Sequence, residues 1–185
     1  NIVIPVNRCF DTHVDNHIIS AQTVHGATFN SLYASGKYTE ESLSMAIGKL
    51  LENTNYKSLS EEEKPEGNRK RYPVGTVVDL PGYENEHFFL WALSTFDNKL
   101  KAHTSMQEYA LAVQKLIESC NEESEGFPVV LPLVGTGLSR TKKGQQDVLK
   151  YLINAFRINK AEINCDIHIV VRNDMKNEIA IMNIK

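Results

Sequence analysis

The stretch LPLVGTGLSR, Leu131 to Arg140, decides how the rest of the sequence is interpreted. The apolar run that leads into it, residues 127–134, predicts a buried strand, and this strand ends at Gly-Thr-Gly. Glycines allow a close approach of the backbone to a ligand, and successive free N–H groups in such a turn can bind an anion. The stretch therefore predicts one of two structures, a plain strand-to-helix turn or a phosphate-binding loop.

The chain on either side of this loop alternates between apolar runs and amphipathic segments. Strands are predicted at residues 1–6, 75–80, 87–93, 127–134 and 167–171, and the tail from Glu178 is compatible with one more. Helices are predicted at residues 23–32, 39–52, 105–120 and 145–156, with Thr23, Thr39 and Ser105 as N-caps. The segment 53–70 is polar and predicts a solvated connection. Apolar strands that alternate with helices indicate an α/β fold whose sheet is covered on both faces.

Length and composition narrow the class of protein. The 185 residues are 42 % hydrophobic, which fits one domain with a sizeable core, and the net charge of −3 argues against a general nucleic-acid binder. Three cysteines without a CxxC pair indicate reduced thiols, and the six histidines form no recognisable metal-ligand set. Because the chain opens inside a predicted strand, we expect it to be a fragment of a longer protein.

A second candidate loop follows the first strand and leads into the first helix. Asn7 comes directly after the strand, where its side chain could contact a ribose or a base. Asp11 and Asp15 could accept hydrogen bonds from ribose hydroxyls or an amino group, and Gly26 would leave the N–H groups of the helix start accessible. The ordinary alternatives are that both aspartates form turns and that His25 is a structural histidine.

The two loops together predict more than either does alone. In sheets of this kind ligands bind beyond the carboxyl ends of the strands, where both loops begin. Thr136 and Ser139 could donate hydroxyl hydrogen bonds, and Arg140 could neutralise a phosphate. The two loops could therefore hold a diphosphate from both sides.

Three motifs resemble those of the macro domain, the ADP-ribose-binding fold. They are IVIPVN (residues 2–7), VHGA (residues 24–27) and PLVGTG (residues 132–137). A narrower resemblance is to the macro domain of Thoeris anti-phage effectors. It is carried by IPVNRCFDTHVD, followed by TVHG, then RYPVGTVVDL (residues 71–80) and PLVGTGLSR. The resemblance covers the whole chain and implies a single domain, residues 1–185, built as a three-layer α/β/α sandwich around a mixed central sheet.

The resemblance also implies which residues bind the ligand. Asn7 would hold the distal ribose, and Arg140 would pair with a phosphate or a ligand carboxylate. From their residue types rather than from the resemblance, we expect Arg8, Phe10, Asp11 and Asp15 to contact the base or a conjugated group. One side of the diphosphate would be held by Val24, His25 and Gly26, and the other by Val134, Gly135, Thr136, Gly137, Leu138 and Ser139.

The function implied is that of a sensor without catalytic residues, cofactor or metal. Its ligand would be an ADP-ribose derivative, a histidine–ADP-ribose conjugate made by a partner enzyme with a Toll/interleukin-receptor domain. Binding would drive homo-oligomerisation at the cytoplasmic face of the bacterial inner membrane, to which a preceding region would anchor the protein. The alternatives are an ADP-ribosyl hydrolase and an interaction module with a vestigial pocket.

Two departures from the macro-domain pattern bear on this choice. The segment between Asn7 and Val24 is long, and Gly26 is the first glycine after Asn7, whereas hydrolytic members follow the asparagine with a run of glycines. This difference favours a ligand-binding role over hydrolysis. In the family, the element that carries the adenine-reading aspartate precedes the first strand, and no residues of this sequence correspond to it. We expect one of three explanations: the element was cut off, another group reads adenine, or the strand comes from elsewhere in the chain.

Overall fold

The computed structural model describes residues 1–134, 144–173 and 179. Its main sheet has six strands in the order β4-β5-β1-β7-β8, with β6 paired to β5, and a separate two-stranded sheet pairs β2 with β3. The strands are β1 (Ile2–Asn7), β2 (Lys57–Ser58), β3 (Lys70–Arg71), β4 (Val77–Pro81), β5 (His87–Phe96), β6 (Ala102–His103), β7 (Val129–Pro132) and β8 (Ile167–Val170). The helices are α1 (Val24–Ala34), α2 (Glu40–Leu50), α3 (Met106–Glu123) and α4 (Gln145–Ile158).

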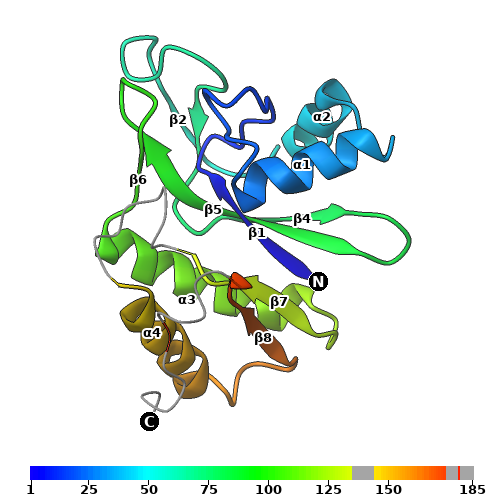
Figure 1. Cartoon of the computed structure of the whole chain (residues 1–185), viewed down its shortest axis with the longest axis vertical. Coiled ribbons are helices and arrows are strands. Elements are labelled where there is room, and N and C mark those ends of the chain that lie inside the picture. Colours follow the sequence, from blue (N-terminus) through cyan, green and yellow to red (C-terminus); the bar gives the residue numbers. More distant parts are fainter. Residues whose placement is uncertain (135–143, 174–178, 180–185) are drawn as a thin grey trace.

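The sheet lies between two layers of helices (Figure 1). Helices α1 and α2 cover one face, and α3 and α4 lie on the other. Strand β1 runs parallel to β5 and β7, and β7 runs parallel to β8, whereas β4 and β6 are antiparallel to β5. The predicted three-layer α/β/α sandwich with a mixed central sheet is confirmed.

Side-chain caps begin three of the helices at the predicted residues. Thr23 accepts a hydrogen bond from the Gly26 amide at the start of α1. Thr39 and Ser105 each cap their helix reciprocally, and in α3 the carboxylate of Glu108 accepts the amide of Ser105. Such caps satisfy amides that have no partner inside the helix, which is why these hydroxyl residues fix the helix starts.

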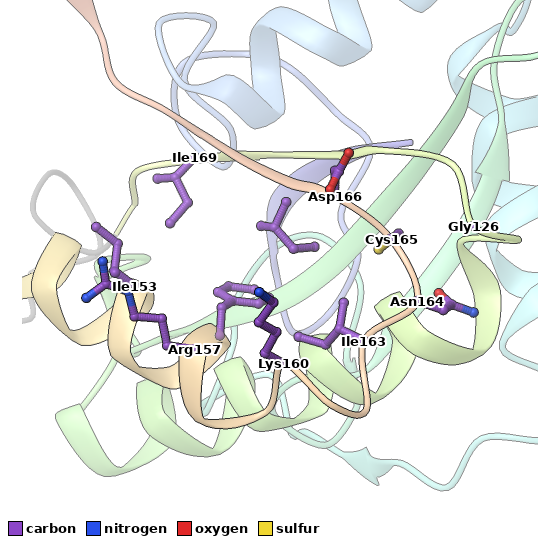
Figure 2. Close-up of a pocket in the computed structure, with 11 residues that line it drawn as sticks. Gly126, Ile153, Arg157, Lys160, Ile163, Asn164, Cys165, Asp166 and Ile169 are labelled. Carbon is purple, nitrogen blue, oxygen red and sulfur yellow. The ribbon is translucent and has the colours of Figure 1, made fainter.

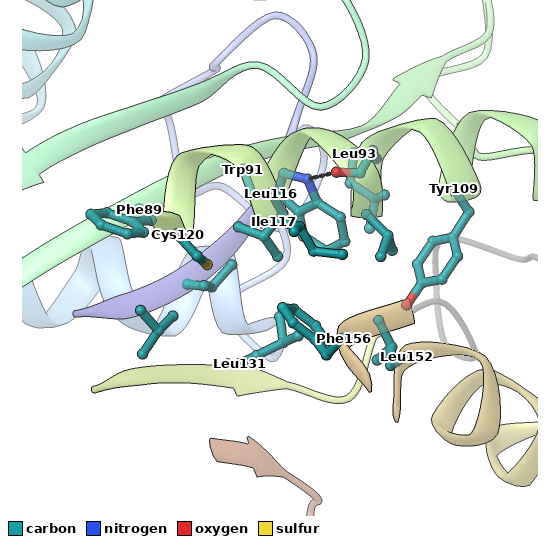
Figure 3. Packing of buried hydrophobic residues seen from close by; sticks show 14 of the residues in the cluster. Phe89, Trp91, Leu93, Tyr109, Leu116, Ile117, Cys120, Leu131, Leu152 and Phe156 are labelled. Carbon is teal, nitrogen blue, oxygen red and sulfur yellow. Dashed lines mark hydrogen bonds between the residues drawn. The ribbon is translucent and has the colours of Figure 1, made fainter. Parts of the chain in front are cut away.

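Each face of the sheet has its own hydrophobic core. On the face covered by α3 and α4, Trp91 is fully buried and donates its indole N–H to the carbonyl of Ala112, 3.0 Å away (Figure 3). On the face covered by α1 and α2, Phe29 and Leu43 pack against Leu90 of the sheet. The two clusters share no buried residue, because successive side chains of a strand point to opposite faces.

The polar segment 53–70 differs from its prediction as a solvated connection. It contributes β2 and most of the short β2–β3 pairing, and the side chain of Lys64 within it is 1 % exposed. Strand β6 was also not predicted. The tail from Glu178, predicted as a further strand, lies outside the described residues apart from position 179.

Candidate functional site

A cavity of about 550 Å³ opens at the carboxyl ends of the parallel strands β1 and β5. Asn7 and Ser94 line it from these two strands, and residues 133–134, directly after β7, line it from the third. The first turn of α1 forms another wall through Thr23, Val24 and His25. The size is that of a small-molecule site, and the position is where ligands bind in parallel sheets.

Asn7 sits where β1 and β5 lose their common register. Val6 pairs with Ala92, but Asn7 pairs with Ser94, so β5 has one extra residue at this point. Irregularities of this kind change the direction of a side chain and are frequent next to binding sites.

Local hydrogen bonds fix the orientation of the Asn7 side chain. Its Oδ1 accepts the amides of Cys9, at 3.0 Å, and of Asp11, at 3.4 Å. Its Nδ2 is buried and has no hydrogen-bond partner among the described residues. A buried donor without a partner is costly, so a ligand that accepts from Asn7 Nδ2 would relieve this cost.

The N-terminus of α1 provides backbone donors at the cavity. The Gly26 amide is already bound by the Thr23 hydroxyl, at 3.0 Å. The amides of Val24 and His25 precede the first intrahelical hydrogen bond and have no acceptor among the described residues. Together with the helix dipole, such free amides favour an anion at this position.

The imidazole of His25 is buried and packs edge-on against Phe29, with ring centroids 4.5 Å apart. Burial lowers its pKa from 6.5 to about 3, and a hydrogen bond with the backbone of Asp11 opposes this effect only in part. The side chain is therefore neutral at physiological pH. His25 can favour an anion through its backbone amide but adds no charge.

The charges around the cavity are one-sided. Lys101 and Arg172 line it, whereas no aspartate or glutamate is among its described lining residues. One end of the cavity is apolar, and there Ile18, Ile19 and Leu100 form a small buried cluster of their own. The arrangement fits a ligand that carries negative charge together with a flat or apolar group.

Four residues predicted for the site line the cavity together, namely Asn7, Val24, His25 and Val134. Gly26 lies directly behind this wall. A Cβ atom on Gly26 would be 2.3 Å from the carbonyl oxygen of Ser20, so glycine is required there for helix α1 to pack on the preceding loop.

The remaining predicted residues of the first loop are engaged within the protein. Arg8 donates to the carbonyl of Tyr72 and forms an ion pair with Glu108, and Phe10 packs edge-on against the Tyr72 ring. Asp11 is 2 % exposed and paired with Lys64.

Asp15 accepts the amides of His17 and Ile18 and so forms a local turn, which was the ordinary alternative for this residue. None of Arg8, Phe10, Asp11 or Asp15 lines the cavity. The predicted loop residues Gly135, Thr136, Gly137, Leu138, Ser139 and Arg140 lie outside the described residues.

Sequence reasoning missed several parts of the wall. Ser94 and Phe96 come from the end of β5, and Leu100 and Lys101 come from the turn that leads to β6. These residues could not be predicted without knowing that β5 pairs with β1, because this pairing places the end of β5 next to Asn7. The apolar pair Ile18-Ile19, inside an otherwise polar loop, was a signal available in the sequence.

A second cavity, of about 580 Å³, lies between α4 and β8 (Figure 2). Its wall is formed by Ile153 of α4 and Ile169 of β8, and Gly126 and Asp166, which precede β7 and β8, also line it. It therefore lies toward the amino ends of these strands. We assign the functional site to the first cavity, where unpaired donors and the strand ends coincide.

No group of three or more His, Cys, Asp or Glu side chains in the described part of the chain is arranged to hold a metal ion. Within the same residues, none of the helices combines the length and the apolar character that crossing a bilayer requires.

The layered fold and the cavity bounded by Asn7 and the start of α1 are those of a macro domain. The family model described as "Thoeris protein ThsA, Macro domain" matches residues 1–172, and the chain belongs to this family of macro domains. It is also 28 % identical over 166 residues to the "Thoeris protein ThsA" of Bacillus amyloliquefaciens (strain Y2). That match covers 86 % of this chain and 52 % of the relative, so the chain spans about half the relative's length.

Proposed function

We propose that this domain is a non-catalytic sensor in Thoeris anti-phage defence, and that it binds an ADP-ribose-derived nucleotide in the cavity beside Asn7. One observation carries the proposal: two kinds of donor without a partner among the described residues lie at the same cavity. They are the side-chain NH₂ group of Asn7 and the first backbone amides of α1. An amide NH₂ donates to a ribose hydroxyl, and a helix N-terminus accommodates a diphosphate. Membership of the ThsA macro-domain family supports the same ligand class.

The charge pattern of the cavity supports an anionic ligand. Lys101 and Arg172 contribute positive charge, and the described lining residues include no carboxylate that would repel a diphosphate. The apolar cluster of Ile18, Ile19 and Leu100 would receive an uncharged ring of the ligand. The adenine of an ADP-ribose derivative is such a ring, and we propose a histidine–ADP-ribose conjugate as the physiological signal.

Binding without turnover is favoured by the acid–base groups at hand. A hydrolase needs a group that takes a proton from water, and such a base works best when its pKa lies near the working pH. Among the described lining residues, no carboxylate is available, and the two imidazoles are those of His17 and His25. His17 lies on the exposed loop, with its Nε2 3.4 Å from a carboxylate oxygen of Glu66, whereas burial lowers the pKa of His25, which lies beside Asn7, to about 3. His25 is therefore a poor proton acceptor at neutral pH.

The wider role rests on the resemblance of the sequence motifs to those of Thoeris effectors rather than on any contact within this chain. We propose that a partner enzyme with a Toll/interleukin-receptor domain makes the signal, and that ligand binding promotes homo-oligomerisation of a membrane-anchored effector. Light scattering on this domain with and without ligand tests whether the domain itself carries the assembly step. A ligand-dependent increase in mass supports assembly through the domain, and an unchanged mass places it elsewhere in the protein.

A thermal-shift panel tests the proposed ligand class. It compares ADP-ribose, NAD, cyclic ADP-ribose variants and the histidine conjugate, each at saturating concentration. A ligand at a hundredfold excess over its dissociation constant stabilises the folded state by about 3 kcal/mol, which is readily seen as a higher melting temperature. We expect the largest shift with the conjugate. No shift with any of these compounds would reject the proposal, and release of ADP-ribose from a modified substrate would indicate the hydrolase.

A further inference from the structure

A buried ion pair outside the cavity connects the segment 64–68 to the loop that follows β1. The ammonium of Lys64 lies 3.1 Å from Oδ1 and 3.0 Å from Oδ2 of Asp11, and both side chains are almost fully buried. Lys64 also donates to the carbonyl of Glu66, at 2.6 Å, and the amide of Asn68 donates to Asp11 Oδ1, also at 2.6 Å. Both of these additional hydrogen bonds come from the segment 64–68.

Each member of the pair also contacts a residue that lines the cavity. The amide of Asp11 donates to Asn7 Oδ1, and its backbone hydrogen-bonds His25. The ammonium of Lys64 lies 5.7 Å from the centre of the Phe96 ring, in a cation–π contact. The segment 64–68 thus contacts the cavity wall directly at Phe96, through Lys64, and at His17, whose Nε2 lies 3.4 Å from Glu66. It reaches Asn7 and His25 only through Asp11, and it does not line the cavity itself.

The orientation of Asn7 depends on this arrangement. Its Oδ1 accepts from Asp11, so the position of the Asp11 backbone helps to decide which way the NH₂ group points. The side-chain amide of Asn68 in turn donates to the carbonyls of Cys9 and Phe10, which holds the backbone on the way to Asp11. A shift of the segment 64–68 would therefore be passed on to Asn7.

Burying this pair is not expected to be a source of stability. Burial raises the pKa of Asp11, and the neighbouring charge of Lys64 and the amide of Asn68 offset this only in part. Buried ion pairs often contribute little to folding because both charges lose their hydration, whereas they can select one arrangement of the surrounding groups. This makes a positioning role a better account of the pair than a stabilising one.

We propose that the Lys64–Asp11 ion pair, docked by the segment 64–68, is a positioning element of the ligand site that orients the Asn7 amide toward the ligand. The identity of the ligand in this proposal rests on the proposed function. The geometry rests on the hydrogen bonds within the protein. The proposal assigns a positioning role to a polar segment whose Lys64 is 53 positions from Asp11 in the sequence.

Gly67 offers a way to move the pair without removing it. Its φ is +76°, and a Cβ atom would lie 2.2 Å from Asp11 Oδ1 and 2.7 Å from Lys64 Nζ. Because both atoms are ends of side chains, Gly67→Ala should displace the pair and leave the fold intact. Gly36→Ala is the matched control, since Gly36 has a φ of +75° and nothing within 4 Å of its Cβ position. Both variants carry the same backbone strain.

The test has two measurements on this chain and the two variants. Calorimetry with ADP-ribose, at a temperature where all three are folded, should show roughly tenfold weaker binding for Gly67→Ala only, as expected for one lost hydrogen bond. ¹H–¹⁵N spectra without ligand should show shifted side-chain amide signals of Asn7 in the same variant only. Those signals are assigned by their loss in Asn7→Asp.

The two measurements separate this inference from the proposed function. If the unmodified chain does not bind ADP-ribose while the Asn7 signals shift in Gly67→Ala, the ligand is wrong and the positioning stands. If Gly67→Ala matches Gly36→Ala in its Asn7 signals, the positioning role is rejected. Should Gly67→Ala not fold, Lys64→Met, which keeps an unbranched side chain one atom shorter and removes its charge, is subject to the same two criteria.

Discussion

Gly26 and Ser20 approach each other so closely that a Cβ atom on Gly26 would lie 2.3 Å from the Ser20 carbonyl oxygen. We therefore expect Gly26→Ala to force the first turn of α1 away from the cavity loop. Forced overpacking of this kind costs roughly 1–3 kcal/mol of unfolding free energy, measured by urea denaturation. ADP-ribose affinity should fall as well, because the amides of Val24 and His25 would move with the turn.

Gly48→Ala is the control for this substitution. Gly48 also lies inside a helix, α2, and nothing is within 4 Å of its Cβ position. There alanine should stabilise the protein by about 0.5–1 kcal/mol through its higher helix propensity. Equal effects of the two substitutions would show that the contact with Ser20 does not limit the packing of α1.

Asn7→Asp tests the donor role of the Asn7 amide group. The substituted side chain keeps an oxygen for the amides of Cys9 and Asp11 but replaces the NH₂ donor by a charged oxygen. We expect at least roughly tenfold weaker ADP-ribose binding in calorimetry, since one hydrogen bond is lost and a negative charge is added. Asn30→Asp, at an exposed position of α1, makes the same change in charge and should bind normally. Similar losses in both variants would point to a general charge effect.

The pH dependence of stability should carry the signature of His25. Its pKa is about 3 in the folded protein and 6.5 when exposed, so between these values the unfolded chain binds a proton that the folded protein does not. Stability is therefore lost as the pH falls below 6.5, by about 1.4 kcal/mol per unit for one proton. Urea denaturation at pH 7.5 and pH 5 should show a smaller difference for His25→Phe than for the unmodified protein. An unchanged difference would mean that His25 titrates normally in the folded state.

Gly137→Glu tests the predicted phosphate loop, which lies outside the described residues. A carboxylate in a loop that binds a diphosphate should abolish detectable ADP-ribose binding through repulsion and lack of space. Gly48→Glu introduces the same charge at an exposed position of α2 and should not change the affinity. Unchanged calorimetric affinity in Gly137→Glu would show that the loop does not contact the ligand.

The fold was largely predictable because its signals are local. Thr23, Thr39 and Ser105 cap helices at the predicted positions, and the apolar runs became the strands β1, β4, β5, β7 and β8. The two-residue strands β2, β3 and β6 were not predictable, since pairs this short depend on which segments meet in space rather than on a sequence pattern.

The sequence predicted those residues of the site whose role follows from their position at the end of a strand or at the start of a helix. Asn7 and the start of α1 follow from their places after a strand and at a helix N-terminus, and both line the cavity. Asp11 was predicted as a ligand contact from its residue type, but its partner, Lys64, is fifty-three positions away in the sequence. Nothing local indicates such a pairing, so the sequence could not show that Asp11 is already engaged.

The separate cores on the two faces of the sheet have a consequence for signalling. Helix α1 belongs to one core, whereas Leu133 and Val134 pack against the other, and all of them border the same cavity. A molecule bound there would therefore contact residues that belong to both cores at once. Amide hydrogen exchange on both faces should then slow in concert upon binding, even at residues far from the bound molecule.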